Sequence, residues 1–225
     1  GVGPDLESVL VDLAVAVGVL GHRLGDLEQI LPRLGDFQTL RLEDGKVQLE
    51  PLHQARMERT ARDLGFVCPP MPPLEQLCPE PLRKGRVKCR FVYRETIREL
   101  SFTPYTPRII HTFAPMALPV GYTYSYKSTD RAVLNRLKEG CAADEVLLVD
   151  SEGRITDCSF ANLAFHREGR WYTPDTPLLE GVQRQFLIQE GLLTPCTIRV
   201  ADLEGYDQIQ PINAMLPLPL KDSCL

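Results

Sequence analysis

Cysteine and histidine side chains carry much of the nucleophilic and metal chemistry of proteins, and this chain has seven cysteines and four histidines. No two cysteines form a C-x-x-C pair, and the histidines are too far apart in sequence to share a metal through local spacing. Cys89 alone has basic neighbours, Lys88 and Arg90, which would favour a thiolate. In an alternating strand, however, both neighbours point away from Cys89. We expect reduced thiols and no metal site, while a Cys/His nucleophilic pair stays an open alternative.

Composition and charge exclude several broad classes of protein. At 225 residues the chain is long enough for one or two domains, and its 44% hydrophobic and 24% charged residues are average for a globular protein. The formal net charge of −5 gives no global positive field for a polyanion, so nucleic acid is not an expected partner. The phosphate-loop, dinucleotide-fingerprint, zinc-protease and nucleophile-elbow motifs are absent from the sequence. These observations alone predict an α+β enzyme or binding domain.

A lysine followed at a distance by an acidic residue is the most informative pattern in the chain. Lys127 ends the segment YSYK and stands thirty residues before Asp157, which lies in the segment ITDCSFAN at 155–162. Upstream is HQARM at 53–57, and LEGVQR follows at 179–184. In this order the four segments resemble the class IV aminotransferase family, the fold type IV pyridoxal-phosphate (PLP) enzymes. In that family an H-x-x-R-[LM] helix comes first, and a Schiff-base lysine precedes a T-E-x-x-x-x-N segment and an L-x-G-[IV]-x-R turn.

Further segments are similar to the aminodeoxychorismate lyase branch of this family. They are GDFQTLR at 35–41, the run from ADE at 143–145 to YTP at 172–174, and INAMLP at 212–217. The resemblance implies an enzyme that removes a proton from the carbon next to nitrogen and ejects pyruvate, leaving 4-aminobenzoate for folate synthesis. Two alternatives stay open. One is a class IV amino-acid aminotransferase, and the other is a non-catalytic relative that keeps the fold and acts as an interaction protein.

The resemblance implies roles for three charged residues. Lys127 would form the imine with the cofactor aldehyde and then move the substrate proton, which requires an unusually easily deprotonated lysine. Asp157 has the position of the family's glutamate, is one methylene shorter, and would keep the cofactor ring nitrogen protonated. Arg56 would bind the cofactor phosphate through its guanidinium fork. Without the resemblance these residues would be a solvated lysine, a turn aspartate and a helix-surface arginine.

Uncharged residues complete the expected site. Gly181, Val182 and Gln183 open a predicted helix, whose free N–H groups and dipole would favour the cofactor phosphate. Asn213 would close the phosphate side from the last loop. Thr39 has the position at which the lyase branch carries a threonine close to the substrate, where it would help the proton transfer. A β-branched residue in a strand also needs no function, so a structural role for Thr39 stays open.

The elements that must position these residues follow from hydrophobic period and turn residues. Asp44-Gly45 supplies positive φ angles for a hairpin of residues 37–42 and 46–49. A proline near its start and Gly65 after its end predict a helix over 51–64. Because both halves mix sheet and helix without a βαβ rhythm, the expected class is α+β with antiparallel or mixed sheets. The other predicted elements are strands at 87–93, 96–102, 145–149, 155, 162–166 and 170–173, and helices at 131–140 and 183–191.

The chain is expected to divide into a divergent N-terminal helical segment (1–35), a small α+β domain (36–112), a proline-marked linker (113–120) and a larger α+β domain with Lys127 (121–225). Residues 6–20 are apolar at helical spacing and too short to span a membrane, which predicts an amphipathic helix. The resemblance implies a homodimer that takes a small-molecule amino substrate. The scattered cysteines indicate a cytoplasmic protein, with no membrane or nucleic acid as partner.

Overall fold

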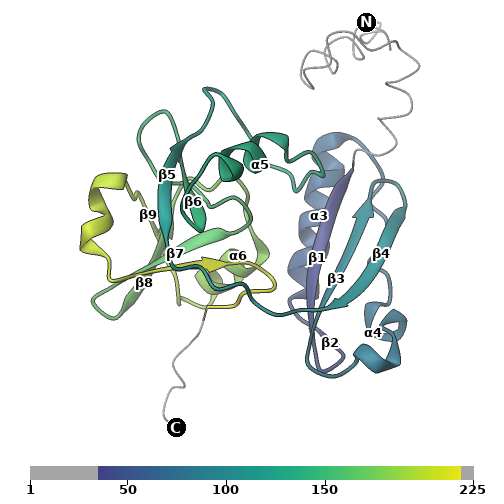
Figure 1. The fold of residues 1–225 in the computed structure, drawn as a ribbon. Coiled ribbons are helices and arrows are strands. Elements are labelled where there is room, and N and C mark those ends of the chain that lie inside the picture. The colour runs from purple at the N-terminus through teal and green to yellow at the C-terminus, as the bar shows by residue number, and fades with distance from the viewer. Residues whose placement is uncertain (1–34, 219–225) are drawn as a thin grey trace, which may run out of the picture. The chain divides into compact units, whose positions relative to one another are not determined.

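The computed structural model of the protein describes residues 35–218. The expected N-terminal segment up to residue 34, including the helix over 6–20, lies outside the described residues, as do His22 and Cys224. The described chain has separate hydrophobic clusters in its first and second halves. We call residues 36–104 the N-terminal lobe and residues 113–218 the C-terminal lobe (Figure 1).

The N-terminal lobe is built on an antiparallel sheet with the strand order β2-β1-β3-β4. Its first hairpin turns at Asp44 and Gly45, whose φ angles are 48° and 79°, as the Asp-Gly pair predicts. The second strand of that hairpin is shorter than expected. The strands are β1 (Asp36–Glu43), β2 (Lys46–Val47), β3 (Arg86–Tyr93) and β4 (Ile97–Pro104).

Helix α3 (Glu50–Leu64) covers one face of this sheet (Figure 1). The predicted helix is confirmed, and Gly65 ends it with a φ of 73°. Because side chains alternate along β1, Leu40 packs with Met57 of the helix in the core, whereas Thr39 belongs to the opposite face. The proline-rich segment that follows contains only the short helices α4 (Leu74–Leu77) and η2 (Glu80–Leu82).

Two sheets form the C-terminal lobe. A four-stranded sheet has the order β10-β7-β8-β9, in which only β8 and β9 are parallel, and a second sheet pairs β5 with β6 in parallel. This mixture of pairings, together with the helices, confirms the α+β class. The strands are β5 (Phe113–Ala117), β6 (Glu145–Val149), β7 (Asn162–Arg167), β8 (Arg170–Pro174), β9 (Thr194–Cys196) and β10 (Gln208–Ile212).

The helices of this lobe begin close to the residues predicted from sequence. They are α5 (Ala132–Glu139), α6 (Val182–Gln189) and the 3₁₀ helix η3 (Val200–Gly205), of which only η3 was not expected. None of the helices within residues 35–218 is long and apolar enough to cross a membrane.

The structure differs from the expected linker over residues 113–120, because β5 occupies its first five positions. Two other strands, β9 and β10, were also missed. Each of the three contains a proline, namely Pro115, Pro195 or Pro211, and each lies at the edge of its sheet. Proline cannot donate to a neighbouring strand but is tolerated at an edge, so a proline that signals a loop in sequence also fits an edge strand.

Candidate active site

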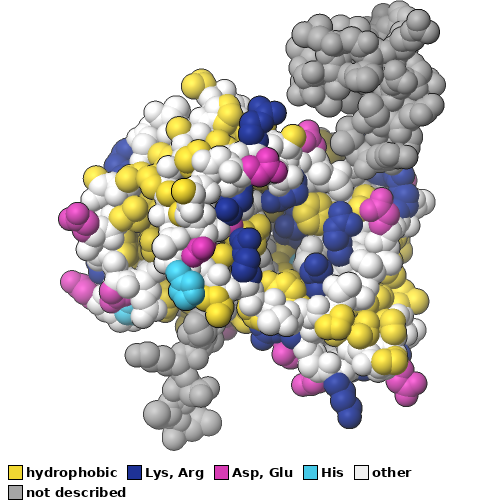
Figure 2. All heavy atoms as spheres, in the orientation of Figure 1, with side chains coloured by type: hydrophobic (Ala, Val, Ile, Leu, Met, Phe, Trp, Pro, Cys, Tyr) yellow, Lys and Arg dark blue, Asp and Glu magenta, His cyan; other side chains and the backbone are white. Residues whose placement is uncertain are grey.

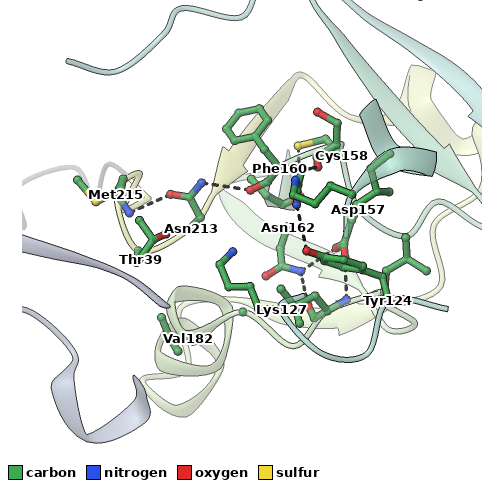
Figure 3. Close-up of a pocket in the computed structure, with 18 of the residues that line it drawn as sticks. Thr39, Tyr124, Lys127, Asp157, Cys158, Phe160, Asn162, Val182, Asn213 and Met215 are labelled. Atoms are coloured by element: carbon green, nitrogen blue, oxygen red, sulfur yellow. Dashed lines mark hydrogen bonds between the residues drawn. The ribbon is translucent and has the colours of Figure 1, made fainter. Parts of the chain in front are cut away.

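A cavity of about 300 Å³, lined by residues of both lobes, brings most of the predicted site together. Seven of the eight predicted residues are in its wall, although they come from segments far apart in sequence (Figure 3). Gln183 is the exception, because its buried side chain does not line the cavity. The location in the wall suits the implied roles, which stay predictions. The seven are Thr39, Arg56, Lys127, Asp157, Gly181, Val182 and Asn213.

Lys127 is held beside the N-terminal lobe by its own main chain. Its carbonyl oxygen accepts a 2.8 Å hydrogen bond from the N–H of Phe37, and its Nζ atom lies 4.7 Å from the centroid of the Phe37 ring. Burial, together with the positive charges of Arg56 and Arg131, lowers the pKa of Lys127 to about 7. A lysine with this pKa is partly a neutral amine near neutral pH. Lys127 can therefore act as a nucleophile or as a base.

Tyr124 and Arg131 fix the loop that carries Lys127. The Tyr124 hydroxyl donates to the carbonyl of Ser128 at 2.7 Å. Arg131, at the start of α5, donates to the Tyr124 hydroxyl at 3.3 Å and also to the carbonyl of Ser159. Ser159 lies two residues after Asp157, the carboxylate that is predicted to pair with the cofactor ring nitrogen. Arg131 thus connects the two segments that carry the lysine and the acid.

Asp157 is a buried and oriented carboxylate. Nδ2 of Asn162 donates to its Oδ1 at 2.7 Å, and the N–H of Leu179 donates to its Oδ2 at 3.0 Å. Burial raises the pKa of Asp157 to about 6, and the two hydrogen bonds oppose that rise because they stabilise the charged form. With 5% of its surface exposed, Asp157 is not a solvated turn residue.

Gly181 makes close contact with Asn162 just before α6. A Cβ atom on residue 181 would lie 2.1 Å from Oδ1 of Asn162, so this position has no room for a side chain. Asn162 also donates to the carbonyl of Leu179 at 2.8 Å, which fixes the turn that leads into the helix. As predicted, Val182 and Gln183 open the helix, where backbone N–H groups have no partner within the helix itself. This end of the cavity can receive an anion.

Arg56 is a buried cation whose hydrogen-bond partner is uncharged. It is 5% exposed, and its guanidinium donates to Oε1 of Gln38, which also lies 3.0 Å from Nδ1 of His53. Its Nε atom has no hydrogen-bond partner within residues 35–218, and burial lowers its pKa to about 10. Among the described residues, no carboxylate forms an ion pair with it. A buried guanidinium in a cavity wall without a carboxylate partner favours an anionic ligand.

Asn213 shapes the wall of the cavity near Thr39 (Figure 3). Its Oδ1 accepts hydrogen bonds from the N–H groups of Met215, at 2.9 Å, and Leu216, at 3.0 Å. Its Nδ2 lies 3.4 Å from the carbonyl oxygen of Phe160. The side chain is therefore engaged within the protein, and its contact with the cofactor phosphate stays a prediction.

The alternative of a thiol nucleophile at Cys89 is wrong. Its side chain is fully buried in the core of the N-terminal lobe, and burial raises its pKa to about 12. Lys88 and Arg90 lie on the opposite face of β3, as strand alternation requires, and both line the cavity. Among residues 35–218, no group of three or more His, Cys, Asp or Glu side chains could hold a metal ion.

Several side chains of the wall were missed from sequence. The alternation that separates Lys88 and Arg90 from Cys89 also places these two cations on one face of the strand, but it does not show that this face lines a cavity. Asn162 could have been found as the last residue of its motif. Nothing local in the sequence marks Arg131, whose partners come from other segments.

Comparison with known proteins gives a consistent picture. The model of the amino-transferase class IV family matches residues 35–218. An "Uncharacterized protein" of Haemophilus influenzae is 39% identical over 183 residues, which cover 80% of this chain and 96% of that protein. A "Putative aminodeoxychorismate lyase" of Schizosaccharomyces pombe is 31% identical over 172 residues, covering 69% of this chain and 73% of that protein. The crystal structure of "a putative 4-amino-4-deoxychorismate lyase" from Haemophilus somnus 129pt shows 32% identity and a TM-score of 0.73, covering 82% of this chain and 98% of that chain.

The family match spans both lobes and includes every residue of the cavity wall. The motif residues that suggested the family from sequence converge on this one cavity. The chain therefore belongs to the class IV aminotransferase family, and it is an α+β enzyme of the PLP-dependent type.

Proposed function

We propose that this enzyme is a lyase that converts 4-amino-4-deoxychorismate to 4-aminobenzoate and pyruvate. The observation that carries the proposal is the position of Thr39, which lines the same cavity as Lys127 and Asp157. In Figure 3 the amino group of Lys127 lies between Thr39 on one side and Asp157 on the other. A hydroxyl therefore borders the space in which the substrate proton would move. The two relatives named for this lyase support the same reaction.

The residues of the cavity fit PLP as the cofactor. Arg56 and the helix start at Gly181 would hold the phosphate, since Nε of Arg56 has no hydrogen-bond partner, and its guanidinium no carboxylate partner, in the part of the chain that the structure describes. Asp157 would pair with the ring nitrogen, and Lys127 would hold the aldehyde carbon. PLP supplies an aldehyde that condenses with amines and a ring that accepts negative charge from the carbon next to nitrogen.

Lys127 would move the proton. Its pKa of about 7 leaves a large neutral fraction at neutral pH, so the amine can accept the proton from the substrate carbon that bears nitrogen. The carbon–oxygen bond to the neighbouring three-carbon group then breaks, the ring becomes aromatic, and the three-carbon group leaves as pyruvate once it has taken up a proton. The Thr39 hydroxyl can donate and accept hydrogen bonds along this path. No amino acceptor is required.

Asp157 would do the work of the longer glutamate because its neighbours hold it in place. The donors from Asn162 and Leu179 fix the direction of the carboxylate, so a shorter side chain is still oriented. A protonated ring nitrogen beside it would lower its pKa from about 6, since an opposite charge favours the carboxylate. The acid would then be ionised throughout the neutral range.

The test supplies the PLP-loaded protein with aminodeoxychorismate in one assay, and with a common amino acid and 2-oxoglutarate in another. We expect pyruvate and 4-aminobenzoate in the first assay and little amino transfer in the second, with Lys127→Ala inactive in both. Protein that transaminates the amino acid but releases no pyruvate would overturn the lyase proposal in favour of an aminotransferase. Protein that gains no absorbance at the visible edge with PLP, and is inactive in both assays, would instead be a non-catalytic relative.

A further inference from the structure

Two cations on strand β3, Lys88 and Arg90, line the cavity without a place in the proposed cofactor site. They alternate with the buried Cys89, so both side chains lie on the cavity face of the sheet. Arg90 is directly opposite Thr39 in the register of β1 and β3. We call Lys88 and Arg90 the β3 cations. They share a wall with the hydroxyl group on which the proposed function depends.

The cavity has a large excess of positive charge. Of the described residues that line it, five carry cationic side chains, and only Asp157 is acidic. Figure 2 shows Lys and Arg side chains gathered around a hollow in the visible face of the molecule. In the proposed site the cofactor phosphate accounts for Arg56, and Lys127 is bound covalently. Arg131 is engaged by oxygen atoms of the protein itself. The charge of the β3 cations is left for a further anion.

The protein provides little compensation for that charge. Nη1 of Arg90 is 3.6 Å from Oε2 of Glu99, whose side chain is 64% exposed, and exposed pairs of this kind are weak. Within residues 35–218, the side chain of Lys88 forms no ion pair or hydrogen bond, although its main chain pairs with β1 and β4. Arg90 also acts on the reacting amine: its positive charge contributes to the lowered pKa of Lys127, and the guanidinium carbon of Arg90 and Nζ of Lys127 lie 5.0 and 4.7 Å from the centroid of the Phe37 ring.

We propose that Lys88 and Arg90 bind a substrate carboxylate that is not attached to the carbon bearing the amino group, which makes the site selective for amino compounds with such a carboxylate. The proposal rests on the proposed lyase function and adds a substrate class to it. Aminodeoxychorismate has this chemistry, because its ring carboxylate and its enolpyruvyl carboxylate are both on other carbons. Charged donors in a partly enclosed cavity bind carboxylates more strongly than the same groups on an open surface.

The experiment uses chorismate, which carries the same two carboxylates but a hydroxyl in place of the amino group, and so binds without reacting. Its affinity for the PLP-loaded protein is measured by calorimetry for the wild type, Lys88→Gln, Arg90→Gln and the double variant. Lys84→Gln, an exposed lysine outside the cavity, is the matched control. We expect a loss of about tenfold for each single variant and about a hundredfold for the double variant, in the range of a lost charge-assisted hydrogen bond. With aminodeoxychorismate, the same variants should raise KM far more than they lower kcat.

The binding results test the role of the β3 cations independently of whether the protein is a lyase. Chorismate affinities within twofold of wild type in the double variant would overturn the role of the β3 cations even in a protein that releases pyruvate. A wild-type protein that binds no chorismate would do the same. PLP affinity is measured through the cofactor absorbance. If it falls in these variants, the β3 cations bind the cofactor and not the substrate, which would also overturn the proposal. Unchanged thermal unfolding of the variants would show that lost binding is not lost folding.

Discussion

Gly181 and Asn162 are in such close contact that a Cβ atom on residue 181 would lie 2.1 Å from Oδ1 of Asn162. The same Asn162 donates to Asp157 through Nδ2. Gly181→Ala should therefore push the amide away and release the carboxylate. Forced side-chain movement in a packed site costs about 1–3 kcal/mol of folding free energy. We expect a lower unfolding temperature and weaker PLP binding, measured by thermal unfolding and by titration of the cofactor absorbance.

Gly205→Ala is the matched control for this substitution. Gly205 ends η3, and a Cβ atom there would meet nothing within 4 Å. This variant should keep the PLP affinity of the wild type and change the unfolding temperature very little. If both variants bind PLP like the wild type, the contact between Gly181 and Asn162 does not position the site.

The pKa of Lys127 sets an expected pH dependence for the attachment of PLP. Only the neutral amine attacks the aldehyde, and the pKa of Lys127 is lowered to about 7. Below pH 7 the lysine is mostly protonated, so the attachment rate should rise as the pH increases through about 7 and then level off. Stopped-flow absorbance after mixing cofactor-free protein with PLP measures this rate. Borohydride reduction and peptide mass analysis should place the label on Lys127.

Arg131→Met tests the cause of that pKa. Arg131 is one of the cations that lower the pKa of Lys127, so its removal should move the midpoint of the rate profile to higher pH. Lys138→Met, on helix α5, which begins directly after Arg131, but outside the cavity wall, should leave the midpoint in place. A wild-type midpoint near 10, the range of an ordinary lysine, would contradict the lowered pKa.

The sequence was most informative where a local rule determines the structure. Asp44-Gly45 predicted the first turn, and Gly65 predicted the end of α3, because few residues adopt positive φ angles. It failed for the edge strand β5, where Pro115 indicates a loop although an edge strand does not need its N–H group. In the site, motif spacing found Lys127 and Asp157. It could not find Arg131, since its role depends on contacts between distant segments.

Asp157→Asn should separate cofactor binding from turnover. The amide has the size of the carboxylate but no charge, so it cannot favour a protonated ring nitrogen. We expect PLP to bind within about tenfold of its wild-type affinity while turnover falls by about a hundredfold or more. Asp157→Glu keeps the charge and should recover a large part of the rate. Turnover of Asp157→Asn equal to that of the wild type would remove this residue from the reaction.

Thr39→Val tests the residue that carries the lyase proposal. Valine keeps the branched shape of threonine in β1 but removes the hydroxyl, so the strand should be preserved while the group that borders the proton path is lost. We expect lyase turnover to fall by about 10-fold to 100-fold, as for other groups that assist proton transfer, with a change of less than about 1 kcal/mol in folding free energy. Pyruvate release and thermal unfolding are measured on the same preparations.

Two further variants show whether the hydroxyl itself matters. Thr39→Ser keeps the hydroxyl and should retain most of the turnover, because the reacting group is preserved even though a methyl group is lost. Thr103→Val makes the same chemical change as Thr39→Val at an exposed position of β4, outside the cavity, and should leave turnover unchanged. If Thr39→Val and Thr39→Ser lose turnover equally, the position is sensitive to any change in packing, and the hydroxyl is not what the reaction requires. If neither loses turnover, Thr39 has only a structural role in β1, and the lyase proposal loses the observation on which it rests.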